Sequence, residues 1–222
     1  MDTVTIVDFD NLAKPQSDVA ESERVISGLI DNLVSRLAWS EGENTLLIRL
    51  YGGWYEDDFT ISRRGSIVMQ ALSEYRGEIL VDNELIIRIK IEIAGSLATE
   101  RNVKIRNTYV QKEGMKNLRV KPGFNSECSH SNQICPAKFI KKLSASALTE
   151  CMVEGCSSIN SEIFIQYGQK QVDTHMASDI LIYSLKDDAI SRIVVITADV
   201  DIIPPVASAL ELSSVEVTVQ VV

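Results

Sequence analysis

Apolar side chains recur along the chain at two spacings, and together they predict a mostly parallel sheet flanked by helices. Residues 4–7, 45–51 and 193–196 are short apolar runs that predict strands, and the last has the composition of a strand buried on both faces. Residues 17–39 and 173–186 carry apolar residues three or four positions apart, which is typical of amphipathic helices. Strands and helices therefore alternate, and this order predicts an α/β fold of the Rossmann-like kind.

The middle of the chain follows a different pattern. Apolar and polar residues alternate there, which is typical of half-buried antiparallel strands, over residues 79–81, 84–93 and 103–110. The core of the fold does not need this material. We therefore interpret residues 81–159 as an inserted β-rich subdomain that contains the cysteines, with an extension of the main sheet as the alternative. The core would then consist of residues 1–80 and 160–222.

Acidic residues stand where the predicted elements begin or end. The first strand runs into Asp8, the strand of residues 193–196 leads to Asp199 and Asp201, and Asp173 opens a helix. The carboxyl ends of parallel strands meet at one edge of a sheet, where α/β proteins bind their ligands. Bare carboxylates at one edge would repel one another by roughly several kcal/mol unless hard cations lie between them. The sequence therefore predicts a Mg²⁺ or Mn²⁺ site.

These residues also resemble the NYN domains of the PIN-like nuclease superfamily. That family has a first strand ending D-x-x-N, a later K-x-V-D that opens a helix, and a strand ending S-G-D-x-D-F. The corresponding residues here are Asp8 and Asn11, then Lys170, Val172 and Asp173, then Thr197, Ala198, Asp199, Asp201 and Ile202. The resemblance covers residues 1 to about 80 and about 160 to 222. It implies a PIN-like fold and a metal-dependent endonuclease, with RNA a more typical substrate than DNA.

The resemblance also implies roles for individual residues. The carboxylates that would bind one or two Mg²⁺ or Mn²⁺ ions and activate a water molecule are Asp8, Asp173, Asp199 and Asp201. The residues expected to support them are Asp10, Asn11, Lys170, Thr197 and Asp179.

Asp179 is ranked below Asp173 as a metal ligand. It lies six residues after Asp173, roughly 240° around the helix, so the two cannot share a face. It is also four residues after His175, and we expect these two side chains to pair.

Two other functions remain open. The chain could be a non-catalytic module that keeps the fold and binds RNA or protein. It could also be a haloacid-dehalogenase-like phosphatase, for which Asp8 and Asp10 would form the opening motif.

The net charge of −9 is unusual for a protein that binds nucleic acid, but the charge is unevenly distributed. Residues 101–142 carry a net charge of +8 and the remainder carries −17. The basic residues expected to contact nucleic acid are Arg101, Lys104, Arg106, Lys116, Arg119, Lys121, Lys138, Lys141 and Lys142. This segment is either a basic arm that holds phosphates or a solvated surface that balances charge.

The cysteines and the aromatic residues each allow two interpretations. All four cysteines fall within 29 residues, as Cys128, Cys135, Cys151 and Cys156. They indicate either a structural Zn²⁺ site or reduced thiols. The aromatic residues at the end of the second strand and in the loop after it, Tyr51, Trp54 and Tyr55, could stack on unpaired bases, but we favour a role in anchoring the loop to the core.

No apolar run in the sequence approaches the roughly 20 residues of a membrane span. The chain begins with an acidic residue and a strand instead of a basic signal segment. We therefore expect a cytoplasmic protein with no membrane partner. The sequence carries no signal for an oligomeric state.

Overall fold

The computed structural model divides the chain into two compact units. The first unit comprises Met1–Val110 and Gln169–Val222, and the second comprises Gln111–Gly168. The described residues are 2–12, 18–56, 60–73, 75, 77–80, 85–99, 101, 103–106, 108–113, 165–169, 171–186 and 189–221. Strands β5 (Tyr109–Glu113) and β6 (Ile165–Gln169) pair with each other in a two-stranded sheet.

The first unit contains a six-stranded sheet of order β3-β4-β2-β1-β7-β8. The strands are β1 (Asp2–Asp8), β2 (Gly42–Tyr51), β3 (Glu78–Leu80), β4 (Leu85–Ile93), β7 (Ile190–Ile196) and β8 (Glu216–Gln220). Five of them run parallel, and only the pairing of β3 with β4 is antiparallel. The predicted mostly parallel sheet flanked by helices is confirmed. The order reverses between β1 and β7, so the crevice that binds ligands in such sheets falls at the ends of these two strands.

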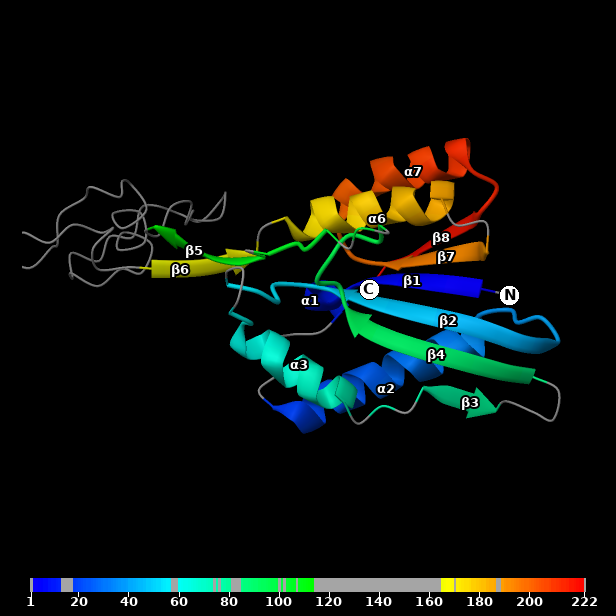
Figure 1. Ribbon diagram of the computed structural model, residues 1–222, viewed down its shortest axis with the longest axis horizontal. Coiled ribbons are helices and arrows are strands. Elements are labelled where there is room, and N and C mark those ends of the chain that lie inside the picture. Colours follow the sequence, from blue (N-terminus) through cyan, green and yellow to red (C-terminus); the bar gives the residue numbers. More distant parts are fainter. Residues whose placement is uncertain are drawn as a thin grey trace, which may run out of the picture. The chain divides into compact units, whose positions relative to one another are not determined.

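Helices cover both faces of the sheet (Figure 1). Helices α2 (Val19–Arg36) and α3 (Arg63–Ser73) lie on one face, and α6 (Val172–Lys186) and α7 (Ile203–Leu212) lie on the other. Two short helical turns, α1 (Phe9–Leu12) and the 3₁₀ helix η1 (Val200–Ile202), follow β1 and β7. Leu185, near the end of α6, lies outside the apolar core with a relative exposure of 53%.

The helices bury the sheet in two apolar clusters. Leu33, Ile48 and Trp54 belong to the cluster under α2 and α3, and Met176 and Ile193 belong to the cluster under α6 and α7. All five side chains are fully buried. At about 25 cal/mol per Å² of buried apolar surface, this burial is the main term that fixes the sheet and hence the edge where its strands end.

Strand β4 corrects one expectation about the insertion. It pairs in parallel with β2 over nine residues, so this part of residues 81–159 extends the main sheet. The antiparallel pairing expected for residues 79–81 and 84–93 is formed between β3 and β4 over Glu78–Leu80. The alternation along β4 has a separate cause. Ile87 and Ile89 face the cluster under α2 and α3, whereas Arg88 and Lys90 point to the other face of the sheet. At β4 that face is not covered by α6, and the two side chains are 61% and 70% exposed.

Residues 103–110 also differ from the expected strand. Lys104 takes part only in an isolated antiparallel bridge with Ser96, and β5 begins at Tyr109. No helix in the described part of the chain is long and apolar enough to cross a membrane.

Candidate active site

The ends of β1 and β7 are joined by a hydrogen bond between side chains. The Thr197 hydroxyl, directly after β7, donates to Asp8 Oδ2 at the end of β1 over 3.1 Å. Asn11 donates to the same carboxylate, from its backbone N–H to Oδ1 over 3.2 Å and from its side-chain amide to Oδ2. Asp8 is only 4% exposed, so these donors fix its orientation. Asn11 and Thr197 are therefore the direct hydrogen-bond donors to Asp8.

Thr197 also orders the acidic turn that follows it. Its hydroxyl accepts the backbone N–H of Asp199 at 3.0 Å, and Asp199 Oδ1 in turn accepts the N–H of Asp201 at 2.9 Å. This second bond caps the start of η1. Ala198 lies outside the left-handed region, so the alanine at a position where the NYN pattern has glycine causes no backbone strain.

The four predicted carboxylates act on one another electrostatically. Burial raises the pKa of Asp8, and the neighbouring Asp199 raises it further, while hydrogen bonds from Asn11 and Thr197 oppose the change. The pKa of Asp173, in the first turn of α6, is also raised, first by partial burial and then by Asp199, Asp8 and Asp201. The structure therefore brings together at one edge the acids that the sequence singled out.

The backbone is strained next to Asp173. Gln171 has a φ of 67°, a left-handed conformation that is uncommon for a residue with a side chain. Its carbonyl accepts the N–H of His175 at 2.9 Å, so this turn starts α6. Such strain occurs more often at functional sites than elsewhere.

The chemistry of these donors fits a hard divalent cation. Carboxylate oxygens are the ligands that Mg²⁺ and Mn²⁺ prefer, and a cation between them would relieve the repulsion that raises the pKa of Asp8 and Asp173. In the described residues, no group of three or more His, Cys, Asp or Glu side chains is already arranged to hold a metal ion.

Asp10 has partners of its own, away from these four acids. It forms an ion pair with Arg64 of α3, and its Oδ2 accepts the N–H of Gly53 at 3.0 Å. A Cβ on Gly52 would lie 3.0 Å from Asp10 Oδ2 and 2.9 Å from the ring of Trp54, so a glycine is needed there. Asp10 thus connects α1 to α3 and to the loop after β2.

Asp179 is fully buried on the inner side of α6 and belongs to a separate network. Its carboxylate accepts hydrogen bonds from Arg49 Nη1 and the Tyr51 hydroxyl, both at 2.6 Å, and from the N–H of Ala98 at 2.7 Å. His175 Nε2 lies 3.2 Å away, so the expected pairing is confirmed. Burial favours a higher pKa for Asp179, but His175, Arg49, Ala98 and Tyr51 together hold it below its ordinary value.

Sequence reasoning missed most of this network. An arginine inside the apolar run of residues 45–51 was the available signal, because a buried guanidinium needs a charged partner. Arg49 is 3% exposed, and its Nε also lies 3.1 Å from Glu92. The partner on α6 could not be identified from spacing, because 130 residues separate Arg49 from Asp179.

The aromatic residues after β2 anchor the loop, which is the role that the sequence favoured. Tyr51 and Trp54 are 1% and 0% exposed, and the Trp54 indole donates to the carbonyl of Leu50 at 2.8 Å. Tyr55 is only half-buried, and the Arg106 guanidinium lies 3.9 Å from the centre of its ring. Tyr51 and Trp54 are therefore not exposed for stacking on bases.

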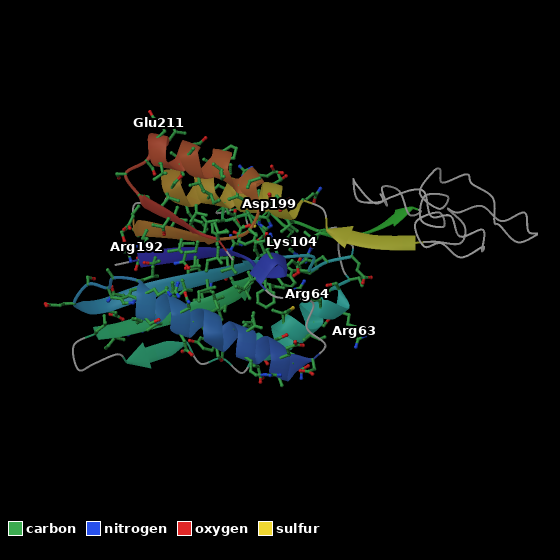
Figure 2. The ribbon with its side chains drawn as sticks, turned by 180° about the vertical axis from the view of Figure 1, so that it is seen from behind. Arg63, Arg64, Lys104, Arg192, Asp199 and Glu211 are labelled. Atoms are coloured by element: carbon green, nitrogen blue, oxygen red, sulfur yellow. The ribbon has the colours of Figure 1, made fainter. Side chains whose placement is uncertain are left out.

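Basic side chains reach the same end of the sheet. Figure 2 shows Lys104, Arg63 and Arg64 at the end where Asp199 lies, with Arg192 and Glu211 toward the opposite end. Lys104, Arg101 and Arg63 are exposed. The predicted site residues that fall outside the described residues are Lys116, Arg119, Lys121, Cys128, Cys135, Lys138, Lys141, Lys142, Cys151, Cys156 and Lys170.

The fold and the site together define a doubly wound α/β protein with a cluster of carboxylates at its topological switch point. No family model matches the chain, and neither a curated protein nor a solved structure matches it. The resemblance to NYN domains therefore supports a proposal and does not assign the chain to a family.

Proposed function

We propose that the protein is a metal-dependent endonuclease that cuts phosphodiester bonds, with RNA as its substrate and the cytoplasm as its location. The observation that carries this proposal is the hydrogen bond from Thr197 to Asp8, which joins the ends of β1 and β7 at the switch point. Asp199 lies two residues after Thr197, and Asp199 and Asp8 both raise the pKa of Asp173 on α6. The order of these residues along the chain matches the NYN motifs, and that resemblance is the reason for choosing RNA.

The residues of the site have distinct roles in this proposal. Asp8, Asp173, Asp199 and Asp201 hold the metal, and Asn11 and Thr197 keep Asp8 oriented toward it. A bound Mg²⁺ or Mn²⁺ would lower the pKa of a water molecule and neutralise charge that builds up on the phosphate. Asp10 takes no part as a ligand, because it is bound to Arg64 and Gly53.

The pairing of Asp10 also bears on the phosphatase alternative. That reaction would use Asp10 beside Asp8, but the Asp10 carboxylate is held by α3 and the loop after β2. Small phosphomonoesters should therefore be poor substrates.

The test is cleavage of labelled RNAs, single-stranded DNA and a small phosphomonoester in Mn²⁺, Mg²⁺ or EDTA. Wild type is compared with Asp199→Asn, which removes one charge from the carboxylate cluster. We expect metal-dependent RNA cleavage that falls by about 100-fold or more in the variant, equal to roughly 2.7 kcal/mol of transition-state stabilisation.

Glu211→Gln is the matched control. Glu211 is an exposed acid on α7 toward the end of the sheet opposite to Asp199, so the same change of charge there should leave cleavage unaltered. RNA binding without cleavage, equal in wild type and Asp199→Asn, would contradict the proposal and support a binding module instead.

A structural Zn²⁺ on Cys128, Cys135, Cys151 and Cys156 is a second, separate part of the proposal. It rests on the clustering of these residues in the sequence. The metal content of the purified protein tests it. We expect about one Zn²⁺ per chain, lost when Cys128 and Cys135 are both replaced by serine.

A further inference from the structure

Residues 94–108, here called the strap, connect β4 to β5 and pass close to α6 on the way (Figure 1). Its described residues form a tight loop. The N–H of Ile105 donates to the carbonyl of Gly95 at 3.0 Å, and the N–H of Leu97 donates to that of Val103 at 2.8 Å. The strap therefore has a defined shape of its own, although only one isolated bridge is formed within its described residues.

Buried charged groups hold the first part of the strap. Arg49 Nη2 donates to the carbonyl of Ser96 at 2.6 Å, and His175 Nε2 lies 2.9 Å from the same oxygen. Asp179 accepts the N–H of Ala98 at 2.7 Å. Arg49 comes from β2 and Asp179 from α6, so a single network fixes the strap to the sheet and to the helix that carries Asp173 in its first turn.

The far end of the strap is held by the loop after β2. The Thr108 hydroxyl accepts the N–H of Tyr55 at 3.0 Å, and Arg106 stacks on the Tyr55 ring. A Cβ on Gly95 would lie 3.0 Å from the Tyr55 hydroxyl, so strap and loop also pack closely. Both ends are thus fixed to elements that border the carboxylate site.

Between these two attachments the strap presents positive charge. Arg101 and Lys104 are exposed, and Lys104 lies at the same end of the molecule as Asp199. An unanchored loop would carry the same charges but would have to be ordered each time substrate bound.

We propose that Asp179 is a positioning residue for the substrate: by fixing the strap, it holds Arg101 and Lys104 where they contact phosphates of the RNA strand next to the scissile one. This inference rests on the proposed function. The strap acts on binding of the strand, whereas Asp8, Asp173, Asp199 and Asp201 act on the metal. Loss of the strap's attachment should therefore raise KM and leave kcat nearly unchanged.

The experiment compares four variants in RNA cleavage and in RNA binding in EDTA. Lys104→Ala combined with Arg101→Ala should raise KM by about 10-fold and lower the slope of log affinity against log salt by about 1.4. Asp179→Asn should raise KM similarly, although it removes no charge from the strap. Thr108→Val, which releases the far end, should raise it less. Lys90→Ala, an exposed lysine on β4 outside the strap, is the control and should change neither quantity.

The possible outcomes distinguish failure of this inference from failure of the proposed function. If Asp179→Asn lowers kcat at unchanged KM, or if the folded variant behaves as wild type, the inference is wrong. If Asp179→Asn does not fold, Thr108→Val decides in its place, because an unchanged KM in that variant contradicts a role for the anchored strap. If wild type neither binds nor cleaves RNA, the proposed function itself has failed.

Discussion

Asp173 is an exposed residue in the first turn of α6, and yet its pKa is raised, by partial burial and by the carboxylates of Asp199, Asp8 and Asp201. A carboxyl group whose pKa is higher in the folded than in the unfolded chain binds a proton more tightly when folded. Ionisation of Asp173 therefore costs stability. The cost is absent below the ordinary pKa and develops as the pH rises through the folded pKa.

Asp173→Asn should accordingly stabilise the metal-free protein at neutral pH, raising the unfolding midpoint by roughly 1–3 °C. The gain should disappear below about pH 4, where the wild-type carboxyl group is protonated in both states. Thermal unfolding followed from about pH 3.5 to about pH 7 in EDTA measures both effects. A variant less stable than wild type at neutral pH would show that Asp173 has a favourable partner.

Arg49 and Asp179 form a deeply buried ion pair, with side chains 3% and 0% exposed. Removing one partner of such a pair leaves a buried charge uncompensated. Asp179→Asn should lower the free energy of unfolding by about 3–5 kcal/mol, and the double variant Arg49→Met, Asp179→Leu should lose less than that. Urea unfolding of Arg49→Met, Asp179→Leu and the double variant measures the coupling between the two side chains. A loss in the double variant equal to the sum of the two single losses would contradict it.

The pKa of Asp179 adds a pH dependence of opposite sign to that of Asp173. Because the folded pKa lies below the ordinary value, the ionised carboxylate contributes stability that is present above the ordinary pKa and is lost as the pH falls through the folded pKa. The two acids of α6 therefore change the stability in opposite directions as the pH rises: ionisation of Asp179 stabilises the fold and ionisation of Asp173 destabilises it.

At the scale of elements, α3 packs closely against the loop after β2 because Gly65 has no side chain. A Cβ on Gly65 would lie 2.7 Å from the Ile61 side chain and 2.8 Å from the carbonyl oxygen of Trp54, which is backbone and cannot rotate away. Gly65→Ala should therefore cost about 1–3 kcal/mol, against the usual helix-stabilising effect of alanine.

Gly28→Ala is the matched comparison for Gly65→Ala. Gly28 lies inside α2, and a Cβ added there would have no atom within 4 Å, so alanine should stabilise by about 0.5–1 kcal/mol. Urea unfolding of both variants measures the difference. The same sign of change in both would contradict the close packing of α3 against the loop.

Strands that are buried on both faces were predicted well, because a short run made almost entirely of apolar residues indicates such a strand directly. Strands β1 and β7 and the acids that follow them lie where the apolar runs indicated. The parallel pairing of β4 with β2 could not be predicted, because alternation indicates only that one face of a strand is exposed and does not identify the neighbouring strand. The strap could not be predicted either, because its contacts with Arg49, Asp179 and Tyr55 join residues far apart in the chain.

At the scale of the whole molecule, a metal that binds the carboxylate cluster should stabilise the folded first unit. At a free concentration about 100 times its dissociation constant, a ligand contributes about 2.7 kcal/mol, which raises the midpoint by roughly 5–10 °C. Mg²⁺ or Mn²⁺ should produce this rise in wild type and a much smaller one in Asp199→Asn.

Tryptophan fluorescence is suited to this measurement. The two tryptophans of the chain, Trp39 and Trp54, both belong to the first unit, so unfolding of residues 111–168 does not contribute directly. Ca²⁺, which prefers a larger coordination shell, provides a comparison between cations. If metal raises the unfolding midpoint equally in wild type and Asp199→Asn, the metal binds outside the carboxylate cluster.

The bond between Thr197 and Asp8 joins residues 189 positions apart. On a ribosome that adds about 5–20 amino acids per second, roughly 10–40 s pass between the synthesis of the two. Throughout that interval β1 can pair with β2 but has no neighbour on its other side. A growing chain therefore cannot assemble the carboxylate cluster until Asp199 and Asp201 have been added, and the nuclease activity proposed here cannot begin before that point.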